Sequence, residues 1–266
     1  MLRFVIPLKS KTVSNNWVVF SKIFERTLKS ICNQTEENFQ VVVVHHEKPE
    51  LSFTDERITF LPADFDPPRL GGDQDLNYCL KNQDKSRKIL MGTYLNLKEE
   101  PSHIMVVDSD DLISNKIARY VNNNNHNKLG WFISKGYFYR EGKKFAFYKK
   151  KDFNLLCGSC LILGRDHVEK VIVPNPVKPK YPLDYYNHKT VIINGKRLEE
   201  LPFAGAIYSM ANSENIQATS KNVKGIASRI FTLEKLIKIL DLMQKYSLRY
   251  LSKKVKNNFG FYKILN

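Results

Sequence analysis

The 266 residues, of which 42% are hydrophobic, can bury one sizeable core, and the length allows one large domain or two small ones. No apolar run is long enough for a membrane-spanning helix, and four cysteines in a chain of this size do not make a disulfide framework. The net charge of +15 indicates a partner that carries phosphate groups or another anionic surface.

The amino terminus and the cysteine content favour one compartment. A strand-like run begins within a few residues of Met1, so we expect no signal peptide. Few cysteines suit a reducing environment. We therefore expect a cytoplasmic protein, with peripheral attachment to the inner membrane face as an alternative.

The first half of the chain alternates between strand and helix patterns. Apolar runs predict strands at Leu2–Leu8, Phe39–Val44 and Arg57–Leu61, and a helical stretch covers about Leu76–Leu97. Between the first two strands, a helix should begin near Ser14 or Asn15. Its apolar stripe, which we assign to the core, comprises Trp17, Phe20, Phe24, Leu28 and Ile31. This alternation predicts an open α/β sheet that binds ligands at the carboxyl ends of its strands.

A carboxylate pair follows a further predicted strand. Ile104–Val107 is short, apolar and rich in β-branched residues, and Asp108, Asp110 and Asp111 come directly after it. In an extended chain Asp108 and Asp110 point the same way, and two such carboxylates suit a hard cation such as Mg²⁺ or Mn²⁺. The alternative is a solvated acidic turn.

Two stretches in this order resemble family 2 glycosyltransferases. Glu25–Val44 is similar to the first helix and second strand of that family, and Val106–Asp111 is similar to its metal-binding Asp-x-Asp motif. The resemblance covers about the first 115 residues. It implies the A-type glycosyltransferase fold, with a mostly parallel central sheet flanked by helices. It also implies a nucleotide-sugar donor, of which a UDP-sugar is the expected form, and a divalent metal.

The resemblance gives roles to residues of the first half. Asp110 matches the metal-binding carboxylate, and Asp108 matches the one near the ribose or the metal's waters. Pro7, Lys9 and Ser10 match the loop that lies against the nucleotide.

The family usually has an acidic residue after the second strand, and here Glu47 is the candidate. It follows two histidines, His45 and His46, which depart from the family pattern and lie near the nucleotide in one interpretation. The family also supplies a basic side chain from the region of Asp84–Lys88, so Arg87 or Lys88 is expected on the diphosphate or base; the alternative is an exposed basic helix face.

The second half matches the family only loosely. An inverting transferase needs a base that takes the proton of the acceptor hydroxyl, and the candidates are Asp184 and Asp166. Asp184 is preferred because two tyrosines and His188 beside it are typical of a sugar-binding surface; ordinary solvated carboxylates are the alternative. The family's Glu-Asp pair and its late metal-binding histidine are missing.

A Cys-x-x-Cys motif lies in this half, at Cys157–Cys160. A structural zinc site needs two more ligands at suitable spacing, and none pairs with the motif. We therefore interpret the cysteines as buried neutral thiols, with Gly158 and Ser159 marking a close backbone approach near the acceptor side.

The chain divides into a catalytic domain and a basic tail. Residues 1–220 form the predicted domain, with a nucleotide-binding half over about 1–115 and an acceptor half over about 116–220. Residues 221–266 carry +9 of the +15 and form the tail. We expect an amphipathic helix there, with an apolar stripe comprising Ile230, Leu233, Ile237, Leu240 and Met243. It either packs on the domain or contacts an anionic membrane, where lipid-linked acceptors reside.

The sequence therefore predicts a metal-dependent, inverting glycosyltransferase. Its partners are a nucleotide-sugar donor and a sugar or lipid-linked sugar acceptor, in glycan or cell-surface polysaccharide synthesis. One alternative is a catalytically inactive relative that binds nucleotide-sugar. A nucleic-acid binder is the weaker alternative, because the excess charge is concentrated in the tail.

Overall fold

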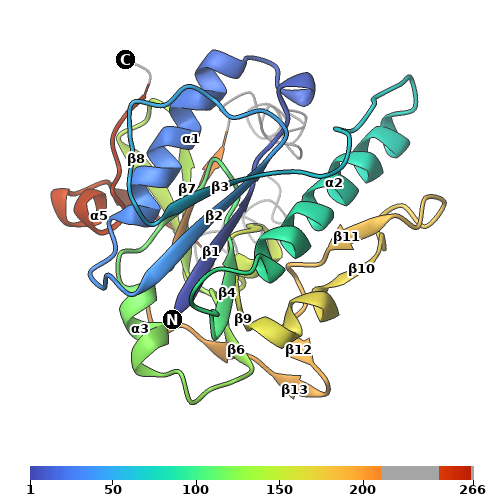
Figure 1. The fold of residues 1–266 in the computed structure, drawn as a ribbon. Helices are drawn as coiled ribbons and strands as arrows, with labels where there is room; N and C mark the ends of the chain where they lie inside the picture. The colour runs from blue at the N-terminus through green and yellow to red at the C-terminus, as the bar shows by residue number, and fades with distance from the viewer. Residues whose placement is uncertain (211–245, 265–266) are drawn as a thin grey trace, which may run out of the picture.

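A seven-stranded sheet forms the centre of the computed structural model, which describes residues 1–210 and 246–264 (Figure 1). Its strand order is β14-β6-β9-β4-β1-β2-β3, and only β9 runs against the others. The bounds are β1 Leu2–Pro7, β2 Phe39–His45, β3 Ile58–Pro62, β4 His103–Val106, β6 Gly130–Phe132, β9 Leu161–Gly164 and β14 Glu199–Glu200. β1 and β4 are buried throughout, and so is all of β2 but Gln40, as strands covered on both faces require.

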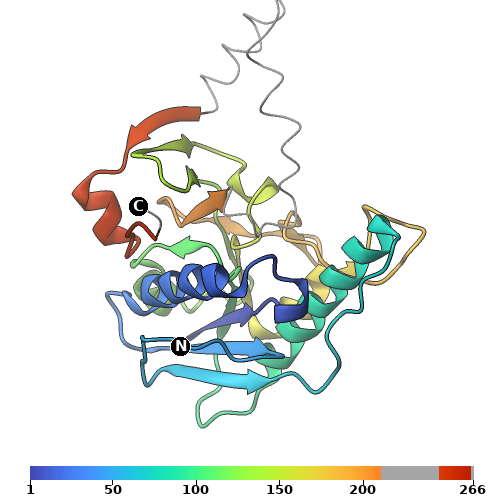
Figure 2. The ribbon, with the colours of Figure 1, turned by 90° about the horizontal axis from the view of Figure 1, so that it is seen from above.

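A second, five-stranded sheet packs beside the first, in the order β16-β8-β7-β15-β5 (Figure 2). Its strands are β5 Leu112–Ile113, β7 Gly136–Arg140, β8 Phe145–Lys149, β15 Ala206–Met210 and β16 Tyr246–Tyr250. β7 and β8 form a hairpin whose turn contains Glu141 and Gly142, and Gly142 has a φ of 82°. Two small hairpins complete the strands: β10 Ile172–Pro174 with β11 Asp184–Tyr186, and β12 Ile192–Ile193 with β13 Lys196–Arg197.

Helix α1 (Trp17–Cys32) follows β1, and its predicted apolar stripe packs in the main core. The helix is capped by Asn16, whose side chain accepts the Val19 N–H, so the helix begins slightly later than the predicted start near Ser14 or Asn15. Lys11–Val13 forms a 3₁₀ turn, and the chain reaches Asn16 in extended conformation only after it.

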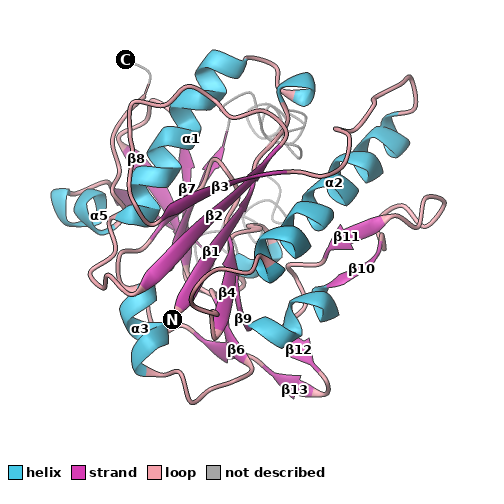
Figure 3. Ribbon diagram, in the orientation of Figure 1, coloured by secondary structure: helices cyan, strands magenta, loops and turns pink. Residues whose placement is uncertain are grey.

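Helix α2 (Gln74–Tyr94) leads into β4 and packs on β1 and β2. Gly92 allows the close contact, since a Cβ there would overlap the side chain of Val5. The remaining helices of the described residues are α3 (Ile117–Asn123) and α5 (Lys253–Asn258), and 3₁₀ turns cover Phe153–Leu155 and Arg165–Val171 (Figure 3). Within residues 1–210 and 246–264, no helix has both the length and the apolar character needed to cross a bilayer.

The predicted α/β class, with a mostly parallel central sheet flanked by helices, is confirmed. The tail differs from its prediction where it is described. Residues 246–250 form a strand that pairs with β8, because Tyr246, Leu248 and Tyr250 alternate with polar residues at strand spacing. The apolar stripe predicted for the tail, Ile230 to Met243, lies outside the described residues.

Candidate functional site

A cavity of about 230 Å³ opens at the carboxyl edge of the central sheet. It lies between the ends of β1 and β4, the first turns of α2, the loop before β9, and β11 and β15. Ligand sites of open α/β sheets lie at this edge because the loops after parallel strands gather there. Four residues predicted for the site line the cavity: Pro7, Lys9, Asp108 and Asp110.

Asp108 is held in an ion pair at the cavity wall. The Lys85 ammonium lies 2.5 Å from Asp108 Oδ1, and the Asp108 N–H donates to Ser159 Oγ over 2.8 Å. Burial opposes the charge of Lys85, but Asp108, Asp111 and Asp110 together raise its pKa. Gly158 touches this pair, and any Cβ at that position would overlap Asp108 Oδ2. The predicted close backbone approach at Gly158 is therefore confirmed.

Asp111 lies behind the cavity and joins three segments. It accepts hydrogen bonds from Ser159 Oγ at 2.7 Å, from Cys157 Sγ at 3.3 Å and from the Ser209 N–H at 3.3 Å. The loop after β4 is thereby tied both to the 157–160 loop and to β15. Burial raises the pKa of Asp111 well above its ordinary value, and the neighbouring Asp110 and Asp108 add to the effect.

The Cys-x-x-Cys motif is buried, as predicted, and both cysteines are free thiols. Desolvation raises the pKa of Cys157 and of Cys160, which keeps both groups neutral.

Three lysines give the cavity its positive charge. Lys81 and Lys85 project from α2, and Lys9 comes from the loop after β1, where its ammonium lies 5.4 Å from the ring centre of Phe20. Burial lowers the pKa of Lys81, and the charge of Lys9 lowers it further. Two like charges near each other attract an anion that can bridge them.

The opposite wall is aromatic. Tyr185 and Tyr186 of β11, Tyr208 of β15 and His188 line it. The Lys85 ammonium lies 5.4 Å from the ring centre of Tyr186. His188 Nδ1 bonds the Asn154 carbonyl at 2.8 Å, and burial lowers the pKa of this histidine to about 4. The wall therefore offers flat, uncharged faces at neutral pH.

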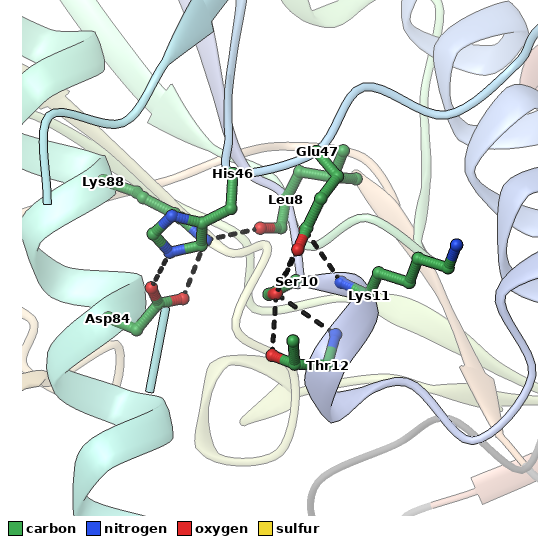
Figure 4. A network of polar contacts seen from close by, with 8 residues as sticks. All are labelled: Leu8, Ser10, Lys11, Thr12, His46, Glu47, Asp84 and Lys88. Atoms are coloured by element: carbon green, nitrogen blue, oxygen red, sulfur yellow. Dashed lines mark hydrogen bonds and ion pairs between the residues drawn. The ribbon is translucent and has the colours of Figure 1, made fainter. Parts of the chain in front are cut away.

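A buried network fixes the rim between β1, β2 and α2 (Figure 4). The Asp84 carboxylate contacts His46 Nε2 at 2.6 Å and Lys88 Nζ at 2.8 Å, and Lys88 donates to the Leu8 carbonyl at 2.8 Å. Lys88 is fully buried and does not line the cavity. The prediction that Lys88 contacts the diphosphate is therefore wrong, because both of its partners lie within the protein. His46 is likewise bound to Asp84.

Glu47 closes the loop after β1 (Figure 4). Its carboxylate accepts from Ser10 Oγ at 3.0 Å and from the Lys11 N–H at 2.9 Å. Neither Ser10 nor Glu47 lines the cavity, so the structure gives them a positioning role where direct nucleotide contacts were predicted. The segment that they hold carries Lys9.

Two other predicted residues lie away from the cavity. Asp166 follows β9 beside the amino end of β4, where the Arg165 N–H donates to the Ser102 carbonyl, so it is at the opposite edge of the sheet. The prediction of Asp166 in the acceptor site is therefore wrong, because β9 runs antiparallel to β4. Arg87 is exposed, and its guanidinium stacks 4.2 Å from the ring centre of Phe65. Arg87 is not among the residues that line the cavity, so its contact with the donor stays a prediction.

Asp184 begins β11 and is exposed. It lies beside Tyr185, which lines the cavity, but its own side chain does not. Its local structure is a strand that pairs with β10.

The sequence interpretation missed the α2 face that lines the cavity. Tyr78, Lys81, Asn82 and Lys85 follow the i, i+3, i+4, i+7 spacing of one helix face. A helix that runs back to start the next parallel strand begins at the carboxyl edge of the sheet. The helical spacing and this direction together could have selected Lys81 and Lys85 over Arg87 and Lys88.

The residues at the site suit a divalent cation that keeps several of its water ligands better than one enclosed entirely by protein ligands. In the part of the chain that the structure describes, no group of three or more His, Cys, Asp or Glu side chains converges as a metal site. Two carboxylates, Asp108 and Asp110, line the cavity after β4. Mg²⁺ is typically bound by one or two carboxylates, with waters and substrate phosphates completing the coordination. These two residues would therefore hold Mg²⁺ or Mn²⁺ together with a phosphorylated ligand.

Comparison with known proteins gives distant structural similarity. No protein-family model and no curated protein matches the chain. The structure of S. aureus TarS 1–349 is 13% identical with a TM-score of 0.41, covering 78% of this chain and 60% of that one. The structure of the same protein in complex with UDP-GlcNAc is 12% identical with a TM-score of 0.39, and the match covers 79% of this chain and 58% of that one. Another S. aureus TarS structure is 12% identical with a TM-score of 0.43, and the match covers 78% of this chain and 36% of that one. The chain thus spans less than two thirds of these structures, and similarity of this size assigns no role to any residue.

Proposed function

We propose that the protein is a glycosyltransferase that binds a nucleoside diphosphate sugar, with UDP as its nucleotide, in the cavity at the carboxyl edge of the central sheet. The observation that carries the proposal is that Asp108 and Asp110 meet Lys9, Lys81 and Lys85 in one cavity. Carboxylates alone suit a cation and lysines alone suit an anion. Both together suit a diphosphate bound with a divalent ion.

The lysines stabilise the leaving group in this proposal. When the bond between the sugar's anomeric carbon and the diphosphate oxygen breaks, negative charge develops on the phosphates. Lys85 is positioned by Asp108 and by Tyr186, so its ammonium is already oriented toward the cavity. A divalent ion held by Asp108 and Asp110 supplies Lewis-acid stabilisation of the same charge.

The aromatic wall binds the acceptor in this proposal, because flat rings stack on sugar faces. The acceptor hydroxyl attacks the anomeric carbon from the side opposite the diphosphate, which gives inversion, and its proton passes to a carboxylate base. Asp184 is the proposed base because it directly precedes Tyr185 of this wall in β11, although its own side chain lies outside the cavity lining. Replacing Asp184 by Asn should leave UDP affinity unchanged and reduce transfer about 100-fold. Turnover equal to the wild type would assign the base elsewhere.

One observation favours a second candidate, an inactive relative that only binds nucleotide-sugar. Among the described residues, the carboxylates that line the cavity are Asp84, Asp108 and Asp110. Asp84 is bound to His46 and Lys88, and the other two suit the metal. No described lining carboxylate is thus left for the base. Hydrolysis or transfer of a bound UDP-sugar separates the candidates.

A thermal-shift screen tests the proposal most broadly. UDP, GDP, ADP and CDP are each added with and without Mn²⁺. A ligand that binds only the native state raises the melting temperature, and the shift grows with its concentration above the Kd. We expect UDP with Mn²⁺ to give the largest shift. No shift with any nucleotide would contradict the proposal.

A further inference from the structure

The outer face of β8 and β16 exposes four large apolar side chains side by side. Leu248 pairs with Phe147, and Tyr250 pairs with Phe145, so all four point to one side of the second sheet. Their exposed fractions are 60% for Leu248, 51% for Phe147, 57% for Tyr250 and 48% for Phe145. In Figure 2, β16 lies beside β8 at the outer edge of this sheet. We call these four residues the apolar face.

Basic residues surround the apolar face. Residues 141–153 and 246–264 each contain five lysines or arginines, of which Lys149 is buried, against two carboxylates in the first segment and none in the second. One of those carboxylates, Glu141, is buried against Arg26, 2.9 Å away. The surroundings of the face are therefore strongly positive.

A small lysine-lined cavity adjoins the face. It has a volume of about 110 Å³ and shares Tyr250 with the apolar face. Its lining contains no carboxylate and is completed by Lys143, Lys144, Lys256, Lys263, Leu251 and Phe261. Four ammonium groups around one hollow suit a phosphate group, and the adjoining Tyr250 and Phe145, whose ring centres lie 5.6 Å apart, suit a hydrocarbon boundary.

The charge decides between partners. A second copy of the chain would bring two strongly positive surfaces together, which repel. An anionic bilayer supplies both complements, because lipid phosphates meet the lysines and acyl chains meet the apolar side chains. We propose that the apolar face and its lysine cavity form a docking surface for an anionic phospholipid membrane.

This surface differs from the tail stripe predicted between Ile230 and Met243, and it does not depend on the proposed nucleotide site. It nonetheless connects with that site. Phe147 lies opposite Phe138 in the β7–β8 pair, and the Phe138 ring lies 5.7 Å from that of Tyr208, a cavity residue. The same face of the second sheet thus runs from the membrane side toward the aromatic wall.

Vesicle co-sedimentation of the full chain tests the docking surface. The vesicles are phosphatidylcholine, with and without phosphatidylglycerol, at low and high salt. The Phe147→Gln/Leu248→Gln and Lys144→Gln/Lys256→Gln variants are compared with the wild type. We expect binding only to phosphatidylglycerol vesicles and weaker binding at high salt. The double lysine variant should bind vesicles about fivefold more weakly for each lysine replaced, the equivalent of about 1 kcal/mol each. The double apolar variant should bind more weakly than the wild type at both salt concentrations.

Matched controls sit on another surface. Ile192 and Val177 are exposed by 57% and 49%, so Ile192→Gln/Val177→Gln changes apolar exposure to a similar degree away from β8 and β16. This control should bind vesicles like the wild type, and all variants should keep the wild-type melting temperature. Unchanged vesicle binding by both test variants would overturn the proposal. A lowered melting temperature in the apolar variant with unchanged vesicle binding would also overturn it, and would indicate that these side chains stabilise the fold.

Discussion

Gly158 sets the position of the Asp108 carboxylate. The residue has no positive φ, so alanine is acceptable to its backbone, but the added methyl group would overlap Asp108 Oδ2 and crowd Lys85 Nζ. We expect Gly158→Ala to displace the ion pair and to weaken binding of UDP with Mn²⁺ by about tenfold or more, an effect of a lost charged hydrogen bond. Titration calorimetry measures this. Gly71→Ala, where a Cβ meets nothing within 4 Å, is the matched control. Equal affinities of the two variants would contradict the assigned role.

Lys85 lines the cavity and is the proposed ligand of the diphosphate. If its ammonium binds the diphosphate, Lys85→Met should lower UDP affinity by about 10- to 100-fold, because a hydrogen bond to a charged group contributes about 1.5–3 kcal/mol. The same variant frees Asp108 of its ion pair, so Mn²⁺ without nucleotide should bind more tightly than to the wild type. Lys98→Met, an exposed lysine outside the cavity, serves as the control. Loss of both nucleotide and metal affinity would point to a disrupted fold instead.

Helix α2 contains lysines in two different environments: Lys85 lines the cavity, whereas Lys88 is buried. Lys88 is buried between Asp84 and the Leu8 carbonyl, so Lys88→Met removes the ammonium from a mostly buried carboxylate that also contacts His46. We expect it to lower the free energy of unfolding by about 3–5 kcal/mol, as for other broken buried pairs. Urea denaturation gives this value. The folded variant should bind UDP normally, and lost UDP affinity with unchanged stability would restore Lys88 as a donor ligand.

Sequence patterns located most elements of the first half because burial on both faces leaves unbroken apolar runs, as in Val41–Val44. They also found Asp108 and Asp110, whose position follows directly from the end of β4. Lys85 is not predicted because its role depends on which face of α2 meets the sheet, and the family resemblance indicates only that a basic residue comes from the region of Asp84–Lys88.

The second half was less predictable, since its positions depend on long-range pairing. Asp166 was placed in the site because the sequence does not show that β9 runs antiparallel to β4. β16 was included in a helix, although Tyr246, Leu248 and Tyr250 alternate in the strand pattern. Its pairing partner, β8, lies about a hundred residues earlier in the chain.

For the whole molecule, three buried histidines predict loss of stability in mild acid. Burial lowers the pKa of His188 to about 4, and it lowers the pKa values of His45 and His103 as well. Each is neutral when folded but takes up a proton on unfolding below pH 6.5. The stabilising contribution is therefore present above pH 6.5 and is lost as the pH falls toward 4. For His188 the loss is about 3 kcal/mol.

Denaturation between pH 4 and pH 7 measures this effect. His188→Gln should have a shallower dependence of unfolding free energy on pH than the wild type, while keeping the contributions of His45 and His103. His126→Gln, at an exposed position, should follow the wild-type curve. Parallel curves for His188→Gln and the wild type would contradict a lowered pKa at this site.

The two sheets meet at the proposed nucleotide site. Asp108 and Asp110 extend from the first sheet, and the neighbouring Asp111 binds Ser209 of the second. We propose that this junction binds a nucleoside diphosphate together with a divalent ion.

Titration calorimetry of UDP into the wild type and Asp110→Asn, each with Mn²⁺ and with EDTA, tests that claim most directly. We predict binding to the wild type with Mn²⁺, and at least tenfold weaker binding with EDTA or in the variant, as expected for a lost charged ligand. Both proteins should unfold at similar temperatures. Equal UDP affinity under all four conditions, or none in the wild type, would contradict the account.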